Sequence, residues 1–406
     1  MQTPRGFQYY LLVVILGGLS AMGPLAIDMY LPSFPAIARE FGAPASAVQA
    51  TVATYFIGLA IGQVFYGPLS DRLGRKGPLL FGLVLFIGAS MGCALATSVR
   101  ALIMWRAVQA LGGCAAMMVA RAVVRDRFDS RDAIRVLSLL LLVMGLAPLL
   151  APLAGGQLLV TFGWRSVFWA LAGCATLGLL AVSMLLDESL PPEQRRRDSL
   201  REVFRVYGTL VRDRAYMAHV LSGGLIMAGM FAYIAASPFV FIELFHVAPQ
   251  RYGFFFGTNA LGIITASQVN GRLAHRVNPR AILRIVLPVA AVAGLVLLIS
   301  AYTGAGGFPG TLVPLFVCVA SVGFVLPNTT VLAMAPHPRV AGSASALLGT
   351  VQFLLGAASA ALAGALGTGT AMPLAVVVAG CACSAFLVQQ SAPRVPSLDD
   401  LPLDQV

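Results

Sequence analysis

The stretch Gly67-Pro-Leu-Ser-Asp-Arg-Leu-Gly-Arg-Lys76 is a short polar segment between two long apolar runs, residues 46–66 and 78–97. Each run is close to the roughly 20 residues that a helix needs to cross a bilayer. Gly67 and Gly74 favour a tight turn with close helix approach, and Asp71 suits a helix N-terminus. The stretch therefore predicts two membrane-crossing helices joined by a charged turn.

The composition of the whole chain agrees with this interpretation. Of its 406 residues, 58% are hydrophobic and 11% are charged, whereas soluble domains carry about 25% charged residues. The net charge of +11 lies in loops rather than on a soluble face, which argues against a nucleic-acid partner. The six cysteines lie in apolar runs and the four histidines are scattered, so we expect no disulfide and no metal site.

Apolar runs long enough to span a membrane predict the fold class: an all-α integral membrane protein with twelve transmembrane helices in two six-helix halves. The first run is too long for a removable signal peptide and lacks a small-residue cleavage site. The predicted spans are residues 7–31, 46–66, 78–97, 101–120, 136–158, 164–186, 216–242, 252–270, 281–302, 310–333, 341–366 and 371–389.

The distribution of basic residues predicts the orientation. With twelve spans both termini lie on one side, and most of the 27 Lys and Arg residues fall in loops on that side. Because basic loops are retained in the cytoplasm, we expect both termini to be cytoplasmic.

A long polar interruption divides the chain in two. We predict an N-terminal six-helix half at 1–186, a cytoplasmic linker at 187–214, a C-terminal six-helix half at 215–390 and a cytoplasmic tail at 391–406. The stretch Gly271-Arg-Leu-Ala-His-Arg-Val-Asn-Pro-Arg280 follows the eighth span as the opening stretch follows the second. The chain is therefore predicted to be a duplication, as in many transporters.

Two further motifs lie in spans. Leu102-Ile-Met-Trp-Arg-Ala-Val-Gln-Ala-Leu-Gly112 places Arg106 inside the fourth span, where a charge is costly and suggests a function. The alternative for Arg106 is that its side chain reaches the outer interface. Ala147-Pro-Leu-Leu-Ala-Pro-Leu-Ala-Gly-Gly156 bends the fifth span and permits close packing; a packing helix without a transport role is the alternative.

These motifs together resemble the major facilitator superfamily and its twelve-span drug/proton antiporters. Ile27-Asp-Met-Tyr-Leu-Pro-Ser-Phe-Pro35 and Ser237-Pro-Phe-Val-Phe-Ile-Glu-Leu-Phe-His-Val-Ala-Pro249 narrow the resemblance to the Bcr/CflA (bicyclomycin resistance) family, as does the entry to the linker. The chain departs from the family patterns at Ala110 and Ala151, where the family has glycine.

The resemblance implies roles for three sets of residues. The opening stretch would latch the two halves in the outward-facing state, with Arg75 paired to Asp126. Its second copy has His275 in place of the acid and would mainly fix topology. The predicted latch is Gly67, Asp71, Arg72, Gly74, Arg75 and Asp126, and the predicted antiporter motif is Pro148, Ala151, Pro152, Gly155 and Gly156.

Asp28 is the predicted proton-coupling carboxylate, with Arg106 as the neighbouring charge that biases it. Burial raises and a nearby arginine lowers the pKa of such a carboxyl, so its protonation can respond to substrate. An interfacial Asp28 without this role is the alternative. Residues expected at the substrate cavity are Tyr30, Tyr55, Gln109, Met230, Tyr233, Asn259 and Asn328; packing is the alternative for these residues.

We therefore expect a secondary active exporter rather than an enzyme. It would expel small amphiphilic drugs, such as bicyclomycin, sulfonamides or phenicols, or metabolites, in exchange for protons by alternating access. The resemblance implies a monomer in the bacterial inner membrane, driven by the proton gradient without a cofactor. The rivals are a proton-coupled uptake symporter of the same fold and a non-transporting membrane sensor.

Overall fold

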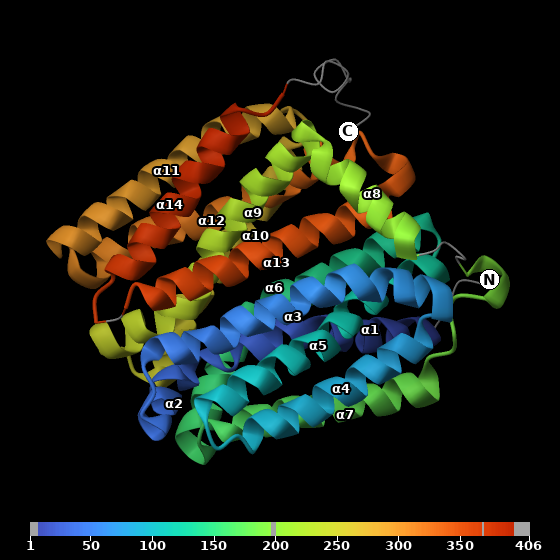
Figure 1. The fold of residues 1–406 in the computed structure, drawn as a ribbon, viewed down its shortest axis with the longest axis horizontal. Helices are drawn as coiled ribbons and strands as arrows, with labels where there is room; N and C mark the ends of the chain where they lie inside the picture. The colour runs from blue at the N-terminus through green and yellow to red at the C-terminus, as the bar shows by residue number, and fades with distance from the viewer. Residues whose placement is uncertain (1–6, 196–199, 368, 394–406) are drawn as a thin grey trace. The chain divides into compact units, whose positions relative to one another are not determined.

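The computed structural model describes residues 7–195, 200–367 and 369–393, and the regular elements in this part of the chain are helices (Figure 1). The chain divides into two compact units, Met1–Leu200 with Pro249–Gly253, and Arg201–Ala248 with Phe254–Val406. A backbone in lipid must satisfy its hydrogen bonds within its own segment, which favours helices. The predicted all-α class is confirmed.

The first unit is built around α5, which packs against α1, α3 and α4 (Figure 1). Small residues allow the close approach: a Cβ added at Gly112 of α5 would lie 2.6 Å from the backbone nitrogen of Phe86 in α4. Ala110 packs against Gly58 of α3, so the glycine on the facing helix accommodates this methyl group. The helices are α1 (Phe7–Asp28), α2 (Phe34–Phe41), α3 (Ala45–Leu73), α4 (Lys76–Ala94), α5 (Val99–Arg127), α6 (Ser130–Phe162) and α7 (Arg165–Leu185), with 3-10 turns at Leu31–Ser33 and Pro192–Gln194.

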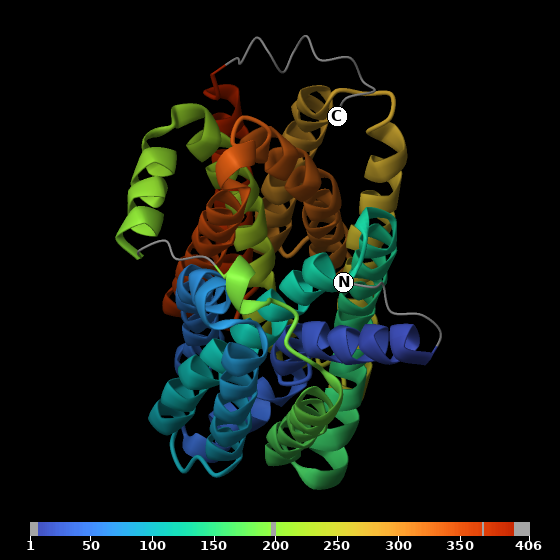
Figure 2. The same cartoon turned by 90° about the vertical axis from the view of Figure 1, so that its right-hand side faces the viewer.

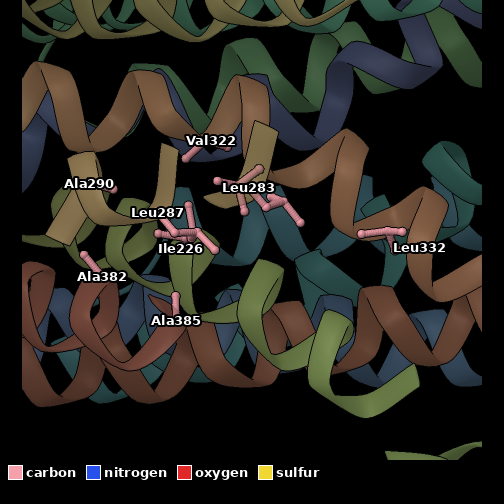
Figure 3. Close-up of a cluster of buried hydrophobic side chains, with 9 residues drawn as sticks. Ile226, Leu283, Leu287, Ala290, Val322, Leu332, Ala382 and Ala385 are labelled. Carbon is pink, nitrogen blue, oxygen red and sulfur yellow. The ribbon is translucent and has the colours of Figure 1, made fainter. Parts of the chain in front are cut away.

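In the second unit α9 packs against α12, α13 and α14 (Figure 2). A cluster of buried aliphatic side chains from α9, α11, α12 and α14, including Ile226, Leu283 and Leu287, forms part of its core (Figure 3). The helices are α8 (Leu200–Arg212), α9 (Arg214–Pro238), α10 (Pro249–Leu273), α11 (Pro279–Thr303), α12 (Gly307–Met334), α13 (Ala341–Ala365) and α14 (Met372–Gln390), with a π-helical turn at Phe239–Leu244 and a 3-10 turn at Pro338–Val340.

Each predicted span coincides with one long helix, and most of these helices extend beyond the predicted bounds. Within the described residues, eleven helical segments are long and apolar enough to cross a membrane. α10 lies at the eighth predicted span and has 25 residues, but it is outside this set, because residues such as Gln250, Asn259 and Asn270 lower its hydropathy.

Large apolar side chains are exposed on the helices of both units. Phe81 on α4, Leu177 on α7 and Ile299 on α11 each have more than 60% of their surface exposed. Exposed apolar surface on this scale marks contact with a membrane or another protein. On helices of this length, it fits contact with lipid.

The opening stretch differs from its prediction as a turn. Residues Gly67–Leu73 continue α3, and only Gly74 and Arg75 separate α3 from α4. Gly74 has φ +95°, a conformation that favours glycine. Gly67 lies in regular helix, where any residue can adopt the backbone conformation. Polarity in the sequence marks the edge of the apolar layer, and the helix extends beyond that edge.

The predicted linker, residues 187–214, contains α8, which is helical from Leu200. Leu210 of α8 packs against Tyr216, Val220 and Ala344 in the second unit. The polar composition of this segment therefore did not reveal that part of it packs on the C-terminal half.

Candidate functional site

Arg75 lies at the centre of a polar network at the α3–α4 junction. It is 6% exposed, and its Nε donates a hydrogen bond to Asp126 Oδ2 at 2.8 Å. Its Nη1 donates to Asp71 Oδ1 at 2.5 Å and to Ser70 Oγ at 3.0 Å. Ser189 Oγ donates to the same oxygen of Asp126 at 3.1 Å. The structure thus brings the ends of α3 and α5 together with the segment after α7.

Of the other predicted latch residues, Gly74 lies directly in this junction and Arg72 is exposed. The Arg75–Asp126 ion pair expected from the resemblance is present. All of these contacts lie within the first unit. The part of the latch hypothesis that concerns conformational state remains a prediction.

Glu188 is a member of this network that sequence reasoning did not identify. Its Oε1 accepts the backbone N–H groups of Arg75 at 2.8 Å and Leu190 at 3.0 Å, and its Oε2 accepts that of Lys76 at 3.2 Å. The first N–H groups of a helix have no partner within the helix, and Glu188 supplies one for the start of α4. An added Cβ at Gly74 would lie 2.4 Å from Glu188 Oε2, so this glycine also makes room for the carboxylate.

The electrostatics of the network follow from these contacts. Burial alone would lower the pKa of Arg75, but its hydrogen bonds to Asp126 and Asp71 outweigh burial and raise that pKa. Burial would raise the pKa of Glu188, but the three backbone N–H groups and the nearby Arg195 hold it below its usual value. Both groups are therefore charged at neutral pH.

Arg106 is fully buried in α5. Its Nη1 donates to the backbone oxygen of Ala26 in α1 at 3.0 Å and to Gln109 Oε1 at 2.6 Å, and Gln109 Nε2 donates to Ser90 Oγ in α4 at 2.7 Å. The guanidinium carbon lies 4.2 Å from the ring centre of Tyr55. The side chain points into the protein, which excludes the alternative that it reaches the outer interface.

The Arg106 guanidinium is incompletely satisfied. Its Nε and Nη2 have no hydrogen-bond partner in the described part of the chain. The ring of Tyr30 lies 4.8 Å from its guanidinium carbon, and cation–π contacts of this kind supply some of the lost solvation. Tyr30, Tyr55 and Gln109, expected at a substrate cavity, thus surround this charge.

Asp28 is the last residue of α1 and is 4% exposed. It lies two residues after Ala26, whose carbonyl accepts from Arg106. Asp28 and Arg106 both lie within electrostatic reach of the Tyr55 hydroxyl, but they form no ion pair with each other among the described contacts. The two groups predicted to couple protons therefore share a neighbourhood without direct pairing.

The predicted antiporter motif lies in α6, with Pro148 and Pro152 inside the helix. Ala151, Gly155 and Gly156 are buried. An added Cβ at Gly155 would lie 2.0 Å from the backbone oxygen of Met29, the residue after Asp28. Glycine at 155 thus permits α6 to touch the end of α1 where the predicted proton carboxylate lies.

The predicted cavity residues of the second unit fall into separate groups. Asn259 Nδ2 donates to the Tyr233 hydroxyl at 2.9 Å, and Asn328 Nδ2 donates to Asn270 Oδ1 at 2.6 Å. Asn259 Oδ1 is buried without a partner in the described structure. Met230 packs against the aliphatic cluster of Figure 3, which agrees with the packing alternative for that residue.

The second copy of the opening stretch begins its helix differently. Asn278 Oδ1 accepts the backbone N–H of Arg280 at 2.9 Å and caps α11 locally. His275, which replaces the acid, is exposed. The two copies therefore satisfy the first N–H groups of their helices with a distant glutamate in one case and a local asparagine in the other.

Comparisons with known proteins agree with the resemblance. The family model described as Major Facilitator Superfamily matches residues 16–361. Over 380 residues the chain is 37% identical to the uncharacterized MFS-type transporter YdgK of Bacillus subtilis, covering 93% of this chain and 94% of that protein. It is 30% identical to a bicyclomycin resistance protein homolog of Haemophilus influenzae, and the match covers 92% of this chain and 93% of that protein.

It is also 29% identical to the multidrug resistance protein MdtL of Escherichia coli, covering 92% of this chain and 93% of MdtL. Among solved structures, a D-xylose-proton symporter matches with a TM-score of 0.73 at 19% identity, covering 96% of this chain and 98% of that one. At this identity the likeness concerns the fold alone.

Replacing Glu188 by Gln tests its role at the start of α4. We expect a loss of about 0.5–1 kcal/mol in unfolding free energy, at the low end for a lost helix cap because water screens this partly buried carboxylate. The folded pKa lies below the reference value of 4.5, so the stabilisation is complete above that pH and falls as pH drops through the folded pKa. Unfolding of purified protein across pH 3 to 7 measures it. Glu193→Gln, an exposed control, should be neutral; equal losses would contradict this role.

Gly155→Ala tests the contact between α6 and α1. The new methyl group would overlap the backbone of Met29, so α6 must shift, and we expect a loss of about 1–3 kcal/mol, as for other overpacked sites. Thermal unfolding in detergent measures the loss. Gly173→Ala in α7 is the control, because its added Cβ would meet no described atom within 4 Å apart from its chain neighbours and the backbone of its own helix. If both variants unfold at the wild-type temperature, the close contact is wrong.

Proposed function

Because the chain belongs to the Major Facilitator Superfamily, we propose that it is a secondary active exporter that expels small amphiphilic drugs in exchange for protons. Its relatives include a bicyclomycin resistance protein homolog and a multidrug resistance protein, which supports drugs as the substrate class. The proposed driving force is the proton gradient, with no metal or organic cofactor.

The observation that carries this proposal is the placement of Asp28. A buried carboxylate in a membrane-spanning protein is costly and suggests a function. Here it ends α1 between two contacts, the carbonyl of Ala26 held by Arg106 on one side and Met29 against Gly155 on the other. Gly155 belongs to the motif that, by resemblance, distinguishes antiporters from symporters.

In the proposed cycle Asp28 carries the proton. Protonation removes the negative charge of the Asp28 carboxylate near Arg106, and deprotonation restores that charge. Since Arg106 already donates to neutral acceptors, its two remaining nitrogen atoms are the donors able to respond to that change. Binding of a proton to Asp28 and binding of the drug would thus exclude each other. This competition would couple the movement of the drug to that of protons in the opposite direction.

The opening stretch is proposed to act as the conformational latch, because the buried Arg75 forms ion pairs with both Asp71 and Asp126. We place the protein in the bacterial inner membrane as a monomer with both termini in the cytoplasm, on the basis of its basic loops. Its partners would be drugs, protons and the bilayer.

Uptake by proton symport is the second candidate. The fold alone does not exclude it, because a D-xylose-proton symporter shares that fold. The fifth-span motif and the names of the sequence relatives favour export. Substrate-induced proton release from acidified everted vesicles would support antiport.

Asp28→Asn tests the proton role. A drug-susceptibility panel in a pump-deleted host, including bicyclomycin, a sulfonamide and a phenicol, first identifies a substrate. In everted vesicles with a pH gradient, a neutral substrate should then cause proton release with the wild type, and Asp28→Asn should reduce it at least tenfold because the carboxyl is lost.

Asp187→Asn, an exposed acid at the end of the same half, is the matched control and should retain release. Protein in the membrane is quantified for each variant. Full proton-driven efflux of a neutral substrate by Asp28→Asn would rule out the proposed role, whatever the substrate.

The two copies of the opening stretch give a paired test of the latch. Asp71→Asn removes an ion pair to buried Arg75, whereas His275→Asn alters an exposed side chain. We expect the resistance conferred by the first variant to fall several-fold and that conferred by the second to stay near wild type. Comparable effects on the inhibitory drug concentration at matched expression would contradict the asymmetry.

A further inference from the structure

A cavity of about 300 Å³ lies in the second unit between the start of α11 and the end of α14. Its lining combines arginine and glutamine side chains with leucine and phenylalanine. The cavity takes no part in the proposed proton and drug pathway, and its chemistry suggests a separate ligand.

The polar part of this cavity is strongly cationic. Arg280 and Arg284 line it, and among the residues that the structure describes no acidic side chain does. In the described part of the chain Arg284 has no ion-pair partner, while Arg280 donates through Nη2 to the carbonyl of Pro393 at 3.3 Å. Gln389 is positioned by its hydrogen bond with His219 Nδ1 at 3.2 Å. Several N–H donors thus converge on one space, as recognition of a phosphate group requires.

One wall of the cavity is apolar and belongs to the buried core. Leu283 and Leu287 line it, and both belong to the buried cluster of α9, α11, α12 and α14 (Figure 3). Phe386 of α14 lines it from the other helix and packs against the same cluster. The occupant therefore needs an anionic group together with carbon atoms.

The cavity lies at the end of two membrane-spanning helices. Arg280 and Arg284 fall in the first six residues of α11, and Gln389 is next to the last residue of α14. At 1.5 Å per residue, Arg284 is within about 8 Å of the helix start, the depth of lipid headgroups. Beyond it the same helices expose apolar side chains, with Ile285 68% and Leu387 62% exposed.

We propose that this cavity binds the phosphodiester headgroup of an anionic phospholipid, with Arg280 and Arg284 as the phosphate ligands. The glycerol carbons would lie over Leu283, Leu287 and Phe386, and the acyl chains would follow the exposed apolar surfaces of α11 and α14. The cavity holds roughly ten water volumes, more than a free phosphate needs. Basic pockets between spanning helices are known to bind lipid headgroups.

The test compares two double variants of the full-length protein that remove the same charge. Arg280→Gln with Arg284→Gln removes the cavity arginines of α11. Arg272→Gln with Arg276→Gln, the loop variant, removes two exposed arginines at the end of α10 and in the connection that follows it, outside the cavity. Phosphatidylglycerol, phosphatidylcholine and inorganic phosphate are titrated into delipidated protein in detergent, and binding is followed by native mass spectrometry and thermal shift.

At about five-fold for each arginine near a headgroup, the cavity variant should bind phosphatidylglycerol roughly 25-fold more weakly. The loop variant should change less than three-fold, and phosphatidylcholine should bind weakly to all. Arg284→Lys in place of Arg284→Gln in the cavity variant should recover part of the affinity, which separates loss of charge from misfolding. Equal losses in both double variants, or inorganic phosphate binding as tightly as phosphatidylglycerol, would overturn the proposal.

Discussion

The buried charge of Arg106 is the constraint on which the first unit depends. A guanidinium inside a spanning helix costs about 3 kcal/mol or more unless the protein supplies acceptors. Here the acceptors come from Ala26 in α1 and Gln109 in α5, with Gln109 tied to Ser90 of α4, and Tyr55 of α3 covers the charge. Four helices therefore converge on one side chain, and the hydrogen bonds and ring contact that they supply to it constrain how they pack.

The two similar segments, Gly67–Lys76 and Gly271–Arg280, are followed by helices that are capped in different ways. α11 is capped by its own Asn278, so its start depends on local sequence. α4 is capped by Glu188 from beyond α7, and the adjoining Arg75 binds Asp126 at the end of α5. Movement of α5 or α7 would therefore disturb the cap of α4, whereas the Asn278 cap of α11 lies within its own segment.

Hydrophobic run length predicted where every long helix lies, because lipid imposes that length directly. It ended the second span at residue 66, whereas α3 continues to Leu73, because polarity in a sequence marks the edge of the membrane and not the end of the helix. The sequence also predicted the Arg75–Asp126 pair, through resemblance. Glu188 was missed because its partners are 112 and 113 positions away and backbone N–H groups leave no mark in a sequence. An acid just after the sixth span, on the side of the basic turn, was the available signal.

The end of α1 contacts both Arg106 in α5 and the Gly155 motif in α6, two features that the sequence had indicated separately. Ala26 is held by Arg106, and Met29 is pressed against Gly155 of α6; Asp28 lies between them. The backbone on both sides of this carboxylate is therefore fixed by other helices, so a change in its charge cannot be absorbed by local movement alone. In the proposed cycle it would act on α5, through the unpaired donors of Arg106, or on α6, through the close contact between Met29 and Gly155. A proton carried at this position, as proposed, would therefore influence helices on either side of it.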